Sequence, residues 1–232
     1  MKGRRLAAAL VLAVAMAPGA VRACALELIL ALDVSGSIDR REFGIQTEGL
    51  AAAFENTSLI AAIETLPGGM AVTMTHWSGI SRQRQMVPWT VIEEPADAQA
   101  FADRIRASGR AWRNFSTAIG EAIHHAQDLS ATAPVTCDRR VIDISGDGVS
   151  NEGRAPAEAS DHLEAQGFII NGLVIRGADP DPVQQYVDEV IAGPGAFVEV
   201  ADGFEDYPRA ILKKLLREID QPLLVGAAPA SE

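Results

Sequence analysis

Short apolar runs alternate along the chain with stretches in which apolar residues recur at helical spacing. Residues 26–32 are apolar on both faces, apart from Glu27 at one end, which is typical of a central strand in a parallel sheet. Residues 38–54 then place apolar side chains such as Phe43 and Phe54 on one side and charged ones on the other. This second pattern predicts an amphipathic helix.

The same two patterns predict the remaining elements and their order. Pro88 places one strand at a sheet edge, because proline cannot donate a hydrogen bond to a neighbouring strand. Strands that alternate with helices predict an α/β fold: a doubly wound, mostly parallel sheet with one antiparallel edge strand and helices on both faces. Helices are expected at residues 59–66, 96–107, 117–129, 155–166, 182–192 and 204–219, and strands at 70–77, 84–92, 140–145, 168–175 and 196–200.

The first 23 residues have the composition of an export signal. A basic start precedes an apolar stretch at residues 6–17, and small residues follow it, so that cleavage is expected after Ala23 or Ala25. An uncleaved membrane anchor is the alternative, but the apolar stretch is short for a membrane-spanning helix. We therefore expect a periplasmic or secreted protein without a membrane span in the mature chain.

Residues 24–220 are expected to form one domain, since the chain has 48% hydrophobic residues and no internal repeat or break in composition. Residues 221–232, rich in Ala, Gly and Pro, are expected to be a flexible tail. Residues 1–23 hold four of the 20 basic residues and no acidic one, so the mature chain has 16 basic and 31 acidic residues and a formal charge of −15. This charge disfavours nucleic acid and anionic membranes as partners.

Oxygen-bearing side chains follow two predicted strands and begin one predicted helix. Asp33, Ser35 and Ser37 stand at alternate positions where the first strand meets a loop. Thr117 begins a later helix, and Asp147 lies between two glycines after a later strand. Ligands of such sheets bind beyond the carboxyl ends of the strands, where both aspartates are expected. Oxygen ligands alone suit Mg²⁺, Mn²⁺ or Ca²⁺ rather than zinc.

Each of these residues also has a simpler interpretation. Ser37 and Thr117 could cap the helices that follow them, and Asp147 could be only a turn residue. Together these interpretations require three coincidences in the right order, which favours metal binding. Asp143 shares a strand face with Ser145 and Asp147, and a buried carboxylate needs partners. Asp143 would either orient the metal loop or make a structural bond to a neighbouring strand or helix.

These positions resemble the von Willebrand factor A (vWA) domain. The resemblance rests on the pattern Asp33-x-Ser35-x-Ser37 after the first strand, followed in order by Thr117 and Asp147. More narrowly, the chain looks like a bacterial exported subfamily of that fold, DUF1194, over nearly the whole mature sequence. The segments that carry this narrower match are residues 30–37, 77–79, 142–148, 171–173 and 193–197.

The resemblance implies a metal-ion-dependent adhesion site (MIDAS). Ser35, Ser37 and Thr117 would offer hydroxyl ligands, whereas Asp33 and Asp147 would hold the ion largely through waters. The ion, expected to be Mg²⁺, would then have few carboxylates bound to it directly, and its charge would be only partly neutralised. It could therefore bind an anionic oxygen from outside the domain. In such sites that oxygen typically belongs to an Asp or Glu of a protein partner.

The segment before the threonine departs from the family pattern. Phe115 and Ser116 stand where many relatives have glycines, which leaves open the path of this loop and direct ligation by Thr117. Trp112 is expected near the same loop, where packing in the core is favoured over a role in recognition.

The two cysteines are expected to form a disulfide. Cys24 lies nine residues before Asp33, and Cys137 lies ten before Asp147. If the strands that carry these aspartates are parallel neighbours, as in the resembled fold, both cysteines meet at the opposite edge of the sheet. Export favours their oxidation. Two free thiols are one alternative, and a lipid on Cys24 is another, although Arg22 fits a lipoprotein signal poorly.

The expected function is that of an exported binding module that captures a protein's Asp or Glu through a divalent cation. A metal-dependent hydrolase and a structural domain stabilised by its metal are the alternatives. An enzyme is disfavoured because Ser35 stands where haloacid-type phosphohydrolases need a second Asp. The chain also has no Gly-x-Ser-x-Gly elbow and no glycine-rich phosphate loop. Since the mature chain is acidic, basic groups are expected around the partner's carboxylate.

Overall fold

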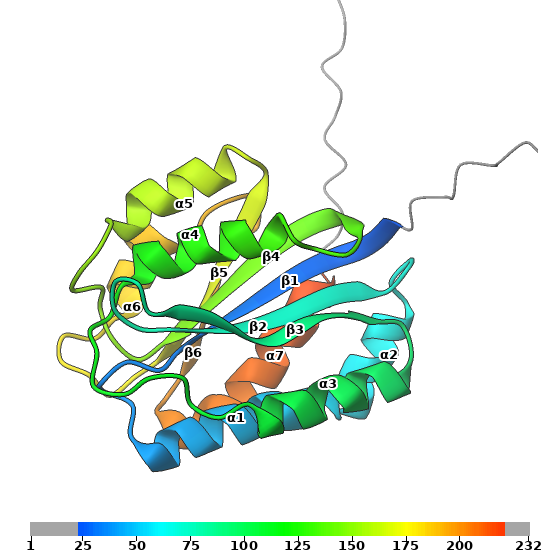
Figure 1. Cartoon of the computed structure of the whole chain (residues 1–232), viewed down its shortest axis with the longest axis horizontal. Coiled ribbons are helices and arrows are strands. Elements are labelled where there is room, and N and C mark those ends of the chain that lie inside the picture. The colour runs from blue at the N-terminus through cyan, green and yellow to red at the C-terminus, as the bar shows by residue number, and fades with distance from the viewer. Residues whose placement is uncertain (1–22, 221–232) are drawn as a thin grey trace, which may run out of the picture.

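The structure is a computed structural model that describes residues 23–220 (Figure 1). In this part of the chain, six strands form one sheet in the order β3-β2-β1-β4-β5-β6. Neighbouring strands are parallel except β2 and β3, which are antiparallel and place β3 at one edge. The predicted sheet is therefore confirmed. Its strands are β1 (Ala23–Asp33), β2 (Met70–Trp77), β3 (Gln83–Ile92), β4 (Thr136–Gly146), β5 (Phe168–Ile175) and β6 (Val198–Ala201).

Helices cover both faces of the sheet (Figure 1). One face carries α1 (Arg40–Phe54), α2 (Thr57–Glu64), α3 (Pro95–Ala107) and α7 (Tyr207–Asp220), the last preceded by the 3₁₀ turn η2 (Phe204–Asp206). The other face carries α4 (Ile119–Ser130), α5 (Pro156–Glu164), α6 (Val183–Gln185) and the π-helical turn η1 (Tyr186–Val190). Among these helices, none has the length and apolar character needed to cross a membrane.

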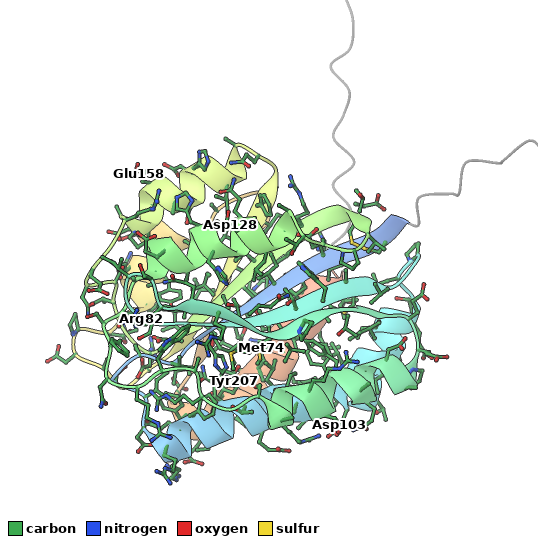
Figure 2. The ribbon with its side chains drawn as sticks, in the orientation of Figure 1. Met74, Arg82, Asp103, Asp128, Glu158 and Tyr207 are labelled. Atoms are coloured by element: carbon green, nitrogen blue, oxygen red, sulfur yellow. A yellow bond between two sulfur atoms is a disulfide. The ribbon has the colours of Figure 1, made fainter. Side chains whose placement is uncertain are left out.

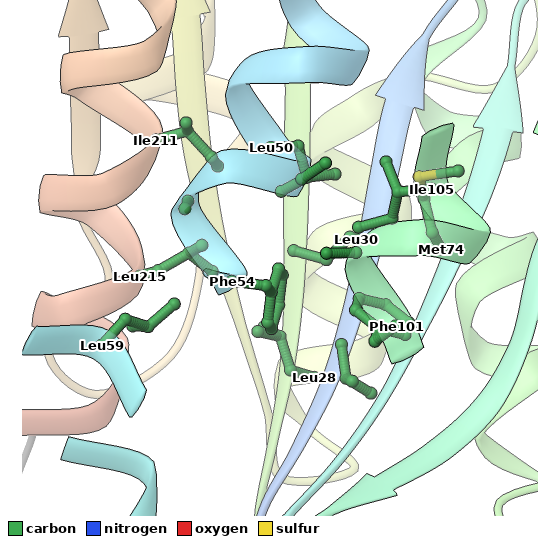
Figure 3. Close-up of a cluster of buried hydrophobic side chains, with 14 of the residues drawn as sticks. Leu28, Leu30, Leu50, Phe54, Leu59, Met74, Phe101, Ile105, Ile211 and Leu215 are labelled. Atoms are coloured by element: carbon green, nitrogen blue, oxygen red, sulfur yellow. The ribbon is translucent and has the colours of Figure 1, made fainter. Parts of the chain in front are cut away.

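The two faces have separate apolar cores, and β1 contributes to both. Leu28 and Leu30 pack on the side of α1 and α3, where the rings of Phe54 and Phe101 meet edge to face at 4.8 Å between centroids (Figure 3). Ile29 belongs to the core on the other face. Alternate side chains of β1 thus point to opposite cores, which explains why residues 26–32 are apolar on both faces.

The helix expected at residues 182–192 is shorter and irregular. It ends as the π turn η1, in which the Ile191 N–H donates to the Tyr186 carbonyl and both Tyr186 and Val190 are buried. A Cβ on Gly172 of β5 would lie 2.7 Å from the Tyr186 ring, so the missing side chain lets this ring approach the sheet. The predicted helix is therefore present as α6 and η1, and its irregular part is the one that packs closely against β5.

Cys24 and Cys137 are register partners on the parallel neighbours β1 and β4, and they form a disulfide. The strand adjacency assumed from the sequence is confirmed, and the alternative of two free thiols is wrong for this structure. The same register places Asp33 and Asp147 at the opposite, carboxyl edge. The predicted export signal, apart from its last residue, and the predicted tail lie outside the described residues.

Candidate metal centre

Loops at the carboxyl edge of the sheet bring the predicted oxygen donors together. Asp33 ends β1, and Ser35 and Ser37 follow it in the next loop, while Asp147 directly follows β4. The Ser37 hydroxyl donates to Asp147 Oδ1 at 2.8 Å, and the hydroxyl oxygens of Ser35 and Ser37 are 3.2 Å apart. Side chains from the loops after β1 and β4 therefore meet in one cluster.

Thr117 joins this cluster from a third loop, which connects α3 to α4. Its backbone N–H donates to Asn151 Oδ1 and its carbonyl accepts from the Asn151 N–H, both at 2.9 Å, so the segment after β4 fixes its position. A Cβ on Gly148 would lie 3.9 Å from the Thr117 hydroxyl oxygen. The Gly36 N–H donates to the Phe115 carbonyl at 2.8 Å, which ties this third loop to the one after β1.

The capping alternatives are wrong for both hydroxyl residues. The N-cap of α1 is Asp39, whose side chain accepts from the Glu42 N–H. The N-cap of α4 is Ala118, which makes no side-chain capping bond, and the Ile119 N–H at the start of that helix donates to the Ser150 hydroxyl at 3.3 Å. Ser37 and Thr117 thus lie before the caps, and their hydroxyl groups do not satisfy the helix ends.

The two carboxylates are buried close to each other, Asp33 being 0% and Asp147 7% exposed. Burial, followed by repulsion from Asp147, raises the pKa of Asp33 to about 8, and burial also raises the pKa of Asp147. Asp33 Oδ1 accepts from the Ser35 N–H at 2.6 Å, whereas Oδ2 has no hydrogen-bond partner among the described residues. A bound cation would satisfy this oxygen and offset the repulsion between the carboxylates.

The chemistry of the donors fits a hard divalent ion. Asp33 and Asp147 supply negative charge, and Ser35, Ser37 and Thr117 supply neutral oxygens, which is a set that Mg²⁺ or Ca²⁺ accepts. Within residues 23–220, no cluster of three or more His, Cys, Asp or Glu side chains is placed to hold a metal. The candidate centre therefore depends on its hydroxyl groups as much as on its carboxylates.

Arg110 covers one side of the cluster and was not predicted from the sequence. Its guanidinium Nη2 donates to the carbonyls of Val34 and Ser35 at 2.9 and 2.8 Å. Burial and the neighbouring Arg113 lower its pKa, and the charge of Asp33 partly opposes this. Arg110 lies in the loop between α3 and α4, which has no periodic pattern, so no sequence signal marked it.

Asp143 and Ser145 lie on β4 beneath the cluster, where Asp143 forms an ion pair with α7. Asp143 Oδ2 is 2.8 Å from Lys214 Nζ, which is also 2.7 Å from Glu218 Oε1, and all three side chains are buried. Asn171 of β5 donates to both Glu218 carboxylate oxygens at 2.9 Å. This geometry corresponds to the structural bond to a neighbouring helix that the sequence left open.

A cleft of about 380 Å³ opens beside Ser37 and Asp147. It separates the loops after β1 and β4 from those after β5 and β6, so the cluster can be reached from outside the domain. The remaining lining residues are Arg41, Glu42, Arg176, Gly177, Ala178, Gly203, Phe204 and Glu205.

Solved structures with this fold include proximal thread matrix protein 1 (PTMP1) from the mussel byssus, with 14% identity, a TM-score of 0.62 and coverage of 85% of this chain and 47% of that one. The pilus adhesin SpaC from Lactobacillus rhamnosus GG has 13% identity, a TM-score of 0.61 and coverage of 84% and 30%. The von Willebrand factor type A protein from Catenulispora acidiphila has 16% identity, a TM-score of 0.54 and coverage of 85% and 43%.

The chain thus matches less than half of the length of each of these three proteins. At such identities the likeness shows the fold alone. One PTMP1 structure has a zinc-occupied MIDAS motif. No curated protein is significantly similar in sequence.

The sequence profile of a family described as "Protein of unknown function (DUF1194)" matches residues 23–223. This range includes every residue that the structure describes. The vWA-type neighbours agree with the order of the strands and the placement of the helices. The chain therefore belongs to the DUF1194 family and has the fold of a vWA domain.

Proposed function

We propose that this protein is an exported module that binds a protein partner through a divalent cation at the carboxyl edge of its sheet. The observation that supports this proposal is the gathering of five oxygen-bearing side chains on three adjoining loops, where Ser35, Ser37 and Asp147 are in hydrogen-bond contact. Among the described residues, Asp33 Oδ2 in this group is buried without a hydrogen-bond donor. We call these five residues the metal-site donors: Asp33, Ser35, Ser37, Thr117 and Asp147.

The proposed roles within the site follow from the charges of the donors. Ser35, Ser37 and Thr117 would contact the ion through neutral hydroxyl oxygens, and Asp33 and Asp147 would hold it largely through waters. Such an ion retains affinity for an external carboxylate and keeps an exchangeable position for it. We propose Mg²⁺, with Mn²⁺ or Ca²⁺ as alternatives, because an oxygen-only set favours hard cations over zinc.

The structural neighbours and the disulfide support a binding role outside the cytoplasm. PTMP1 is named as a matrix protein and SpaC as a pilus adhesin, which is consistent with a binding module rather than an enzyme. The Cys24–Cys137 disulfide fits an oxidising compartment. We therefore propose that the mature protein acts in the periplasm or after secretion and presents its metal-site donors to a partner's Asp or Glu.

The direct test is capture of a partner from the exported fraction of the source cells, using the mature chain with Mg²⁺ or with excess chelator. A partner should be retained only with the metal, and Ser37→Ala or Asp147→Ala should abolish its retention. Ser58→Ala, which removes an exposed hydroxyl on α2 at the opposite edge, is the matched control and should bind normally. Neutralising one acidic residue of the partner should also abolish binding. Equal capture in chelator would refute the proposal and leave the metal a stabilising role.

A further inference from the structure

Two loops beside the metal-site donors form one continuous surface. The turn between β2 and β3 meets the loop between α3 and α4, because the Ser78 hydroxyl donates to the Ser116 carbonyl and the Ala118 N–H donates to the Ser78 carbonyl, both at 3.0 Å. Figure 2 shows Arg82 at the end of the sheet where this turn lies. Through Arg110, which donates to the Ser35 carbonyl at 2.8 Å, the same surface reaches the metal-site donors.

The two loops of this surface are basic although the protein is acidic, and one carboxylate, that of Glu152, contacts them by accepting from the Ile80 N–H at 2.6 Å. Residues 78–84 and 108–117 contain four arginines and no Asp or Glu, whereas the whole chain has 31 acidic and 20 basic residues. In the described part of the chain, no ion pair joins Arg82, Arg84 or Arg113 to a carboxylate. Their charges are therefore available to an external group.

Some arginines elsewhere on the surface are neutralised by carboxylates. Arg106 Nη1 is 2.5 Å from a carboxylate oxygen of Glu55, and its Nη2 is 2.8 Å from one of Glu48. Arg209 Nη2 is 2.7 Å from Asp206 Oδ2. Arg104 on α3 and Arg217 on α7 also form no ion pair with a carboxylate of the described residues, but they lie on separate helices. What is local to the metal-site donors is the grouping of three such arginines on two joined loops.

Aromatic rings hold two of these arginines in place. The Arg82 guanidinium lies 4.6 Å from the centroid of the Phe115 ring, and the Arg84 guanidinium lies 5.1 Å from that of Trp112. A cation–π contact positions a guanidinium without neutralising its charge. The half-buried Trp112 belongs to neither core, so the packing role expected from the sequence is wrong and its ring supports the surface instead.

The same surface exposes apolar side chains. Ile80 is 51% and Phe115 41% exposed, and only Val187, at 46%, is a comparably exposed large hydrophobic residue within residues 23–220. Positive charge and apolar area therefore lie next to each other. We call this surface the arginine–aromatic rim and define it by Ile80, Arg82, Arg84, Trp112, Arg113 and Phe115.

We infer that the arginine–aromatic rim recognises an acidic polypeptide segment that also carries an apolar side chain. One carboxylate of the segment completes the metal site, which is the part that rests on the proposed function. Neighbouring carboxylates pair with Arg82, Arg84 and Arg113, and the apolar side chain packs on Ile80 and Phe115. The acidic net charge of the mature chain by itself predicts basic groups around the partner's carboxylate. This inference predicts acidic groups there instead, since the charge next to the metal-site donors is positive even though the net charge of the chain is negative.

A short protein segment fits this rim better than a long polyanion. The overall negative charge of the domain repels a nucleic acid or an acidic polysaccharide wherever such a chain extends past the rim. An apolar group beside the carboxylates adds contacts that a uniform polyanion lacks. The rim and the metal site together thus favour a protein partner with a local cluster of Asp and Glu.

A displayed library of random linear peptides tests this inference without knowledge of the natural partner. Selection on the immobilised mature protein in Mg²⁺ should enrich peptides with several acidic residues and one large apolar residue. The triple variant Arg82→Gln, Arg84→Gln, Arg113→Gln should still select peptides with one acidic residue, but these peptides should no longer be enriched in further acidic residues beside it. Ile80→Ser should lose the apolar preference and keep the acidic one.

Affinity measurements on the best selected peptide make the test quantitative. Its dissociation constant should rise at least about tenfold in the rim triple variant, since three exposed ion pairs are lost. The matched control Arg104→Gln, Arg209→Gln, Arg217→Gln removes the same charge from α3 and α7 and should change the constant less than about twofold.

The chelator separates the two proposals. Acidic peptides that depend on the rim arginines but stay bound in chelator would support the rim and refute metal-mediated capture. Peptides that the chelator releases but that show no acidic enrichment, or an enrichment unchanged in the rim triple variant, would overturn the rim inference and leave the proposed function standing. Tighter binding of single-stranded DNA or heparin than of every selected peptide would overturn the assignment of a polypeptide partner.

Discussion

Ser37 donates a hydrogen bond of 2.8 Å to Asp147 although 110 positions separate them in the sequence. The bond forms because β1 and β4 are parallel neighbours, so the loops that follow them begin side by side. The disulfide between Cys24 and Cys137 links the same two strands near their amino ends. One strand pair therefore carries a covalent link at one edge of the sheet and the candidate metal centre at the other.

We predict that Asp33→Asn abolishes binding of Mg²⁺ and Mn²⁺ and leaves the fold intact. Asparagine keeps the acceptor for the Ser35 N–H but removes the charge that a cation needs. The metal-free variant should be at least as stable as the metal-free wild type, since the buried carboxylate next to Asp147 is neutralised. Titration calorimetry measures the binding, and urea unfolding measures the stability.

Asp39→Asn is the matched control for this substitution. Asp39 caps α1 and is exposed, and asparagine is an equally good N-cap residue. Metal affinity and stability should both be unchanged in this variant. Unaltered Mg²⁺ binding by Asp33→Asn would remove Asp33 from the site.

The sequence predicted the sheet well because buried strands carry a strong pattern. The limits of β2 and β5 agree with the expected residues 70–77 and 168–175 at both ends. The helix expected at residues 182–192 is present but shorter and irregular, and its Tyr186 packs into the space left by Gly172 on a distant strand. Such a tertiary contact leaves no local sequence signal.

The candidate site also has residues that the sequence could predict and residues that it could not. Its five donors could be proposed because each stands at the end of a predicted strand or the start of a predicted helix. Arg110 could not, since it acts from an aperiodic loop. Lys214 is buried while the adjacent Lys213 is exposed, and two adjacent lysines look alike until the helix is docked on the sheet.

Removal of the disulfide should lower the stability substantially. The bridge joins residues 113 positions apart, and a loop of that length corresponds to about 4–5 kcal/mol in the chain-entropy model. Urea unfolding of the double variant Cys24→Ala, Cys137→Ala should show this loss. Thiol reductant should reproduce it in the wild type and have no effect on the double variant. Free thiols at both positions in protein purified from the exported fraction without reductant would contradict the prediction.

Lys214→Met should destabilise the domain by about 3–5 kcal/mol, because Asp143 and Glu218 would remain buried without their cation. The neighbouring Lys213→Met is the matched control. Lys213 is 64% exposed, and its partner Glu199 keeps Arg209, so the loss should stay below about 1 kcal/mol. Chemical unfolding of both variants decides the matter, and equal losses would mean that the Lys214 charge is not buried.

The last prediction concerns acid. His76 on β2 is 0% exposed, and neither ring nitrogen has a hydrogen-bond partner among the described residues. Burial, and then the charge of Arg110, lowers its pKa to about 3. The unfolded chain takes up this proton below its ordinary pKa of about 6.5, whereas the folded chain does not until the pH approaches the lowered value. Acidification therefore favours the unfolded state through this residue.

His76→Phe should remove this pH-dependent term and keep the edge contact with the Phe43 ring. Relative to the variant, the wild type should lose about 1.4 kcal/mol of unfolding free energy for each pH unit below about 6.5. Above pH 7 the difference between them should be constant. Urea unfolding across this range measures the term, with His162→Phe, an exposed position on α5, as the control. Parallel profiles for the wild type and His76→Phe would show that the buried ring takes up its proton as readily in the folded chain as in the unfolded one.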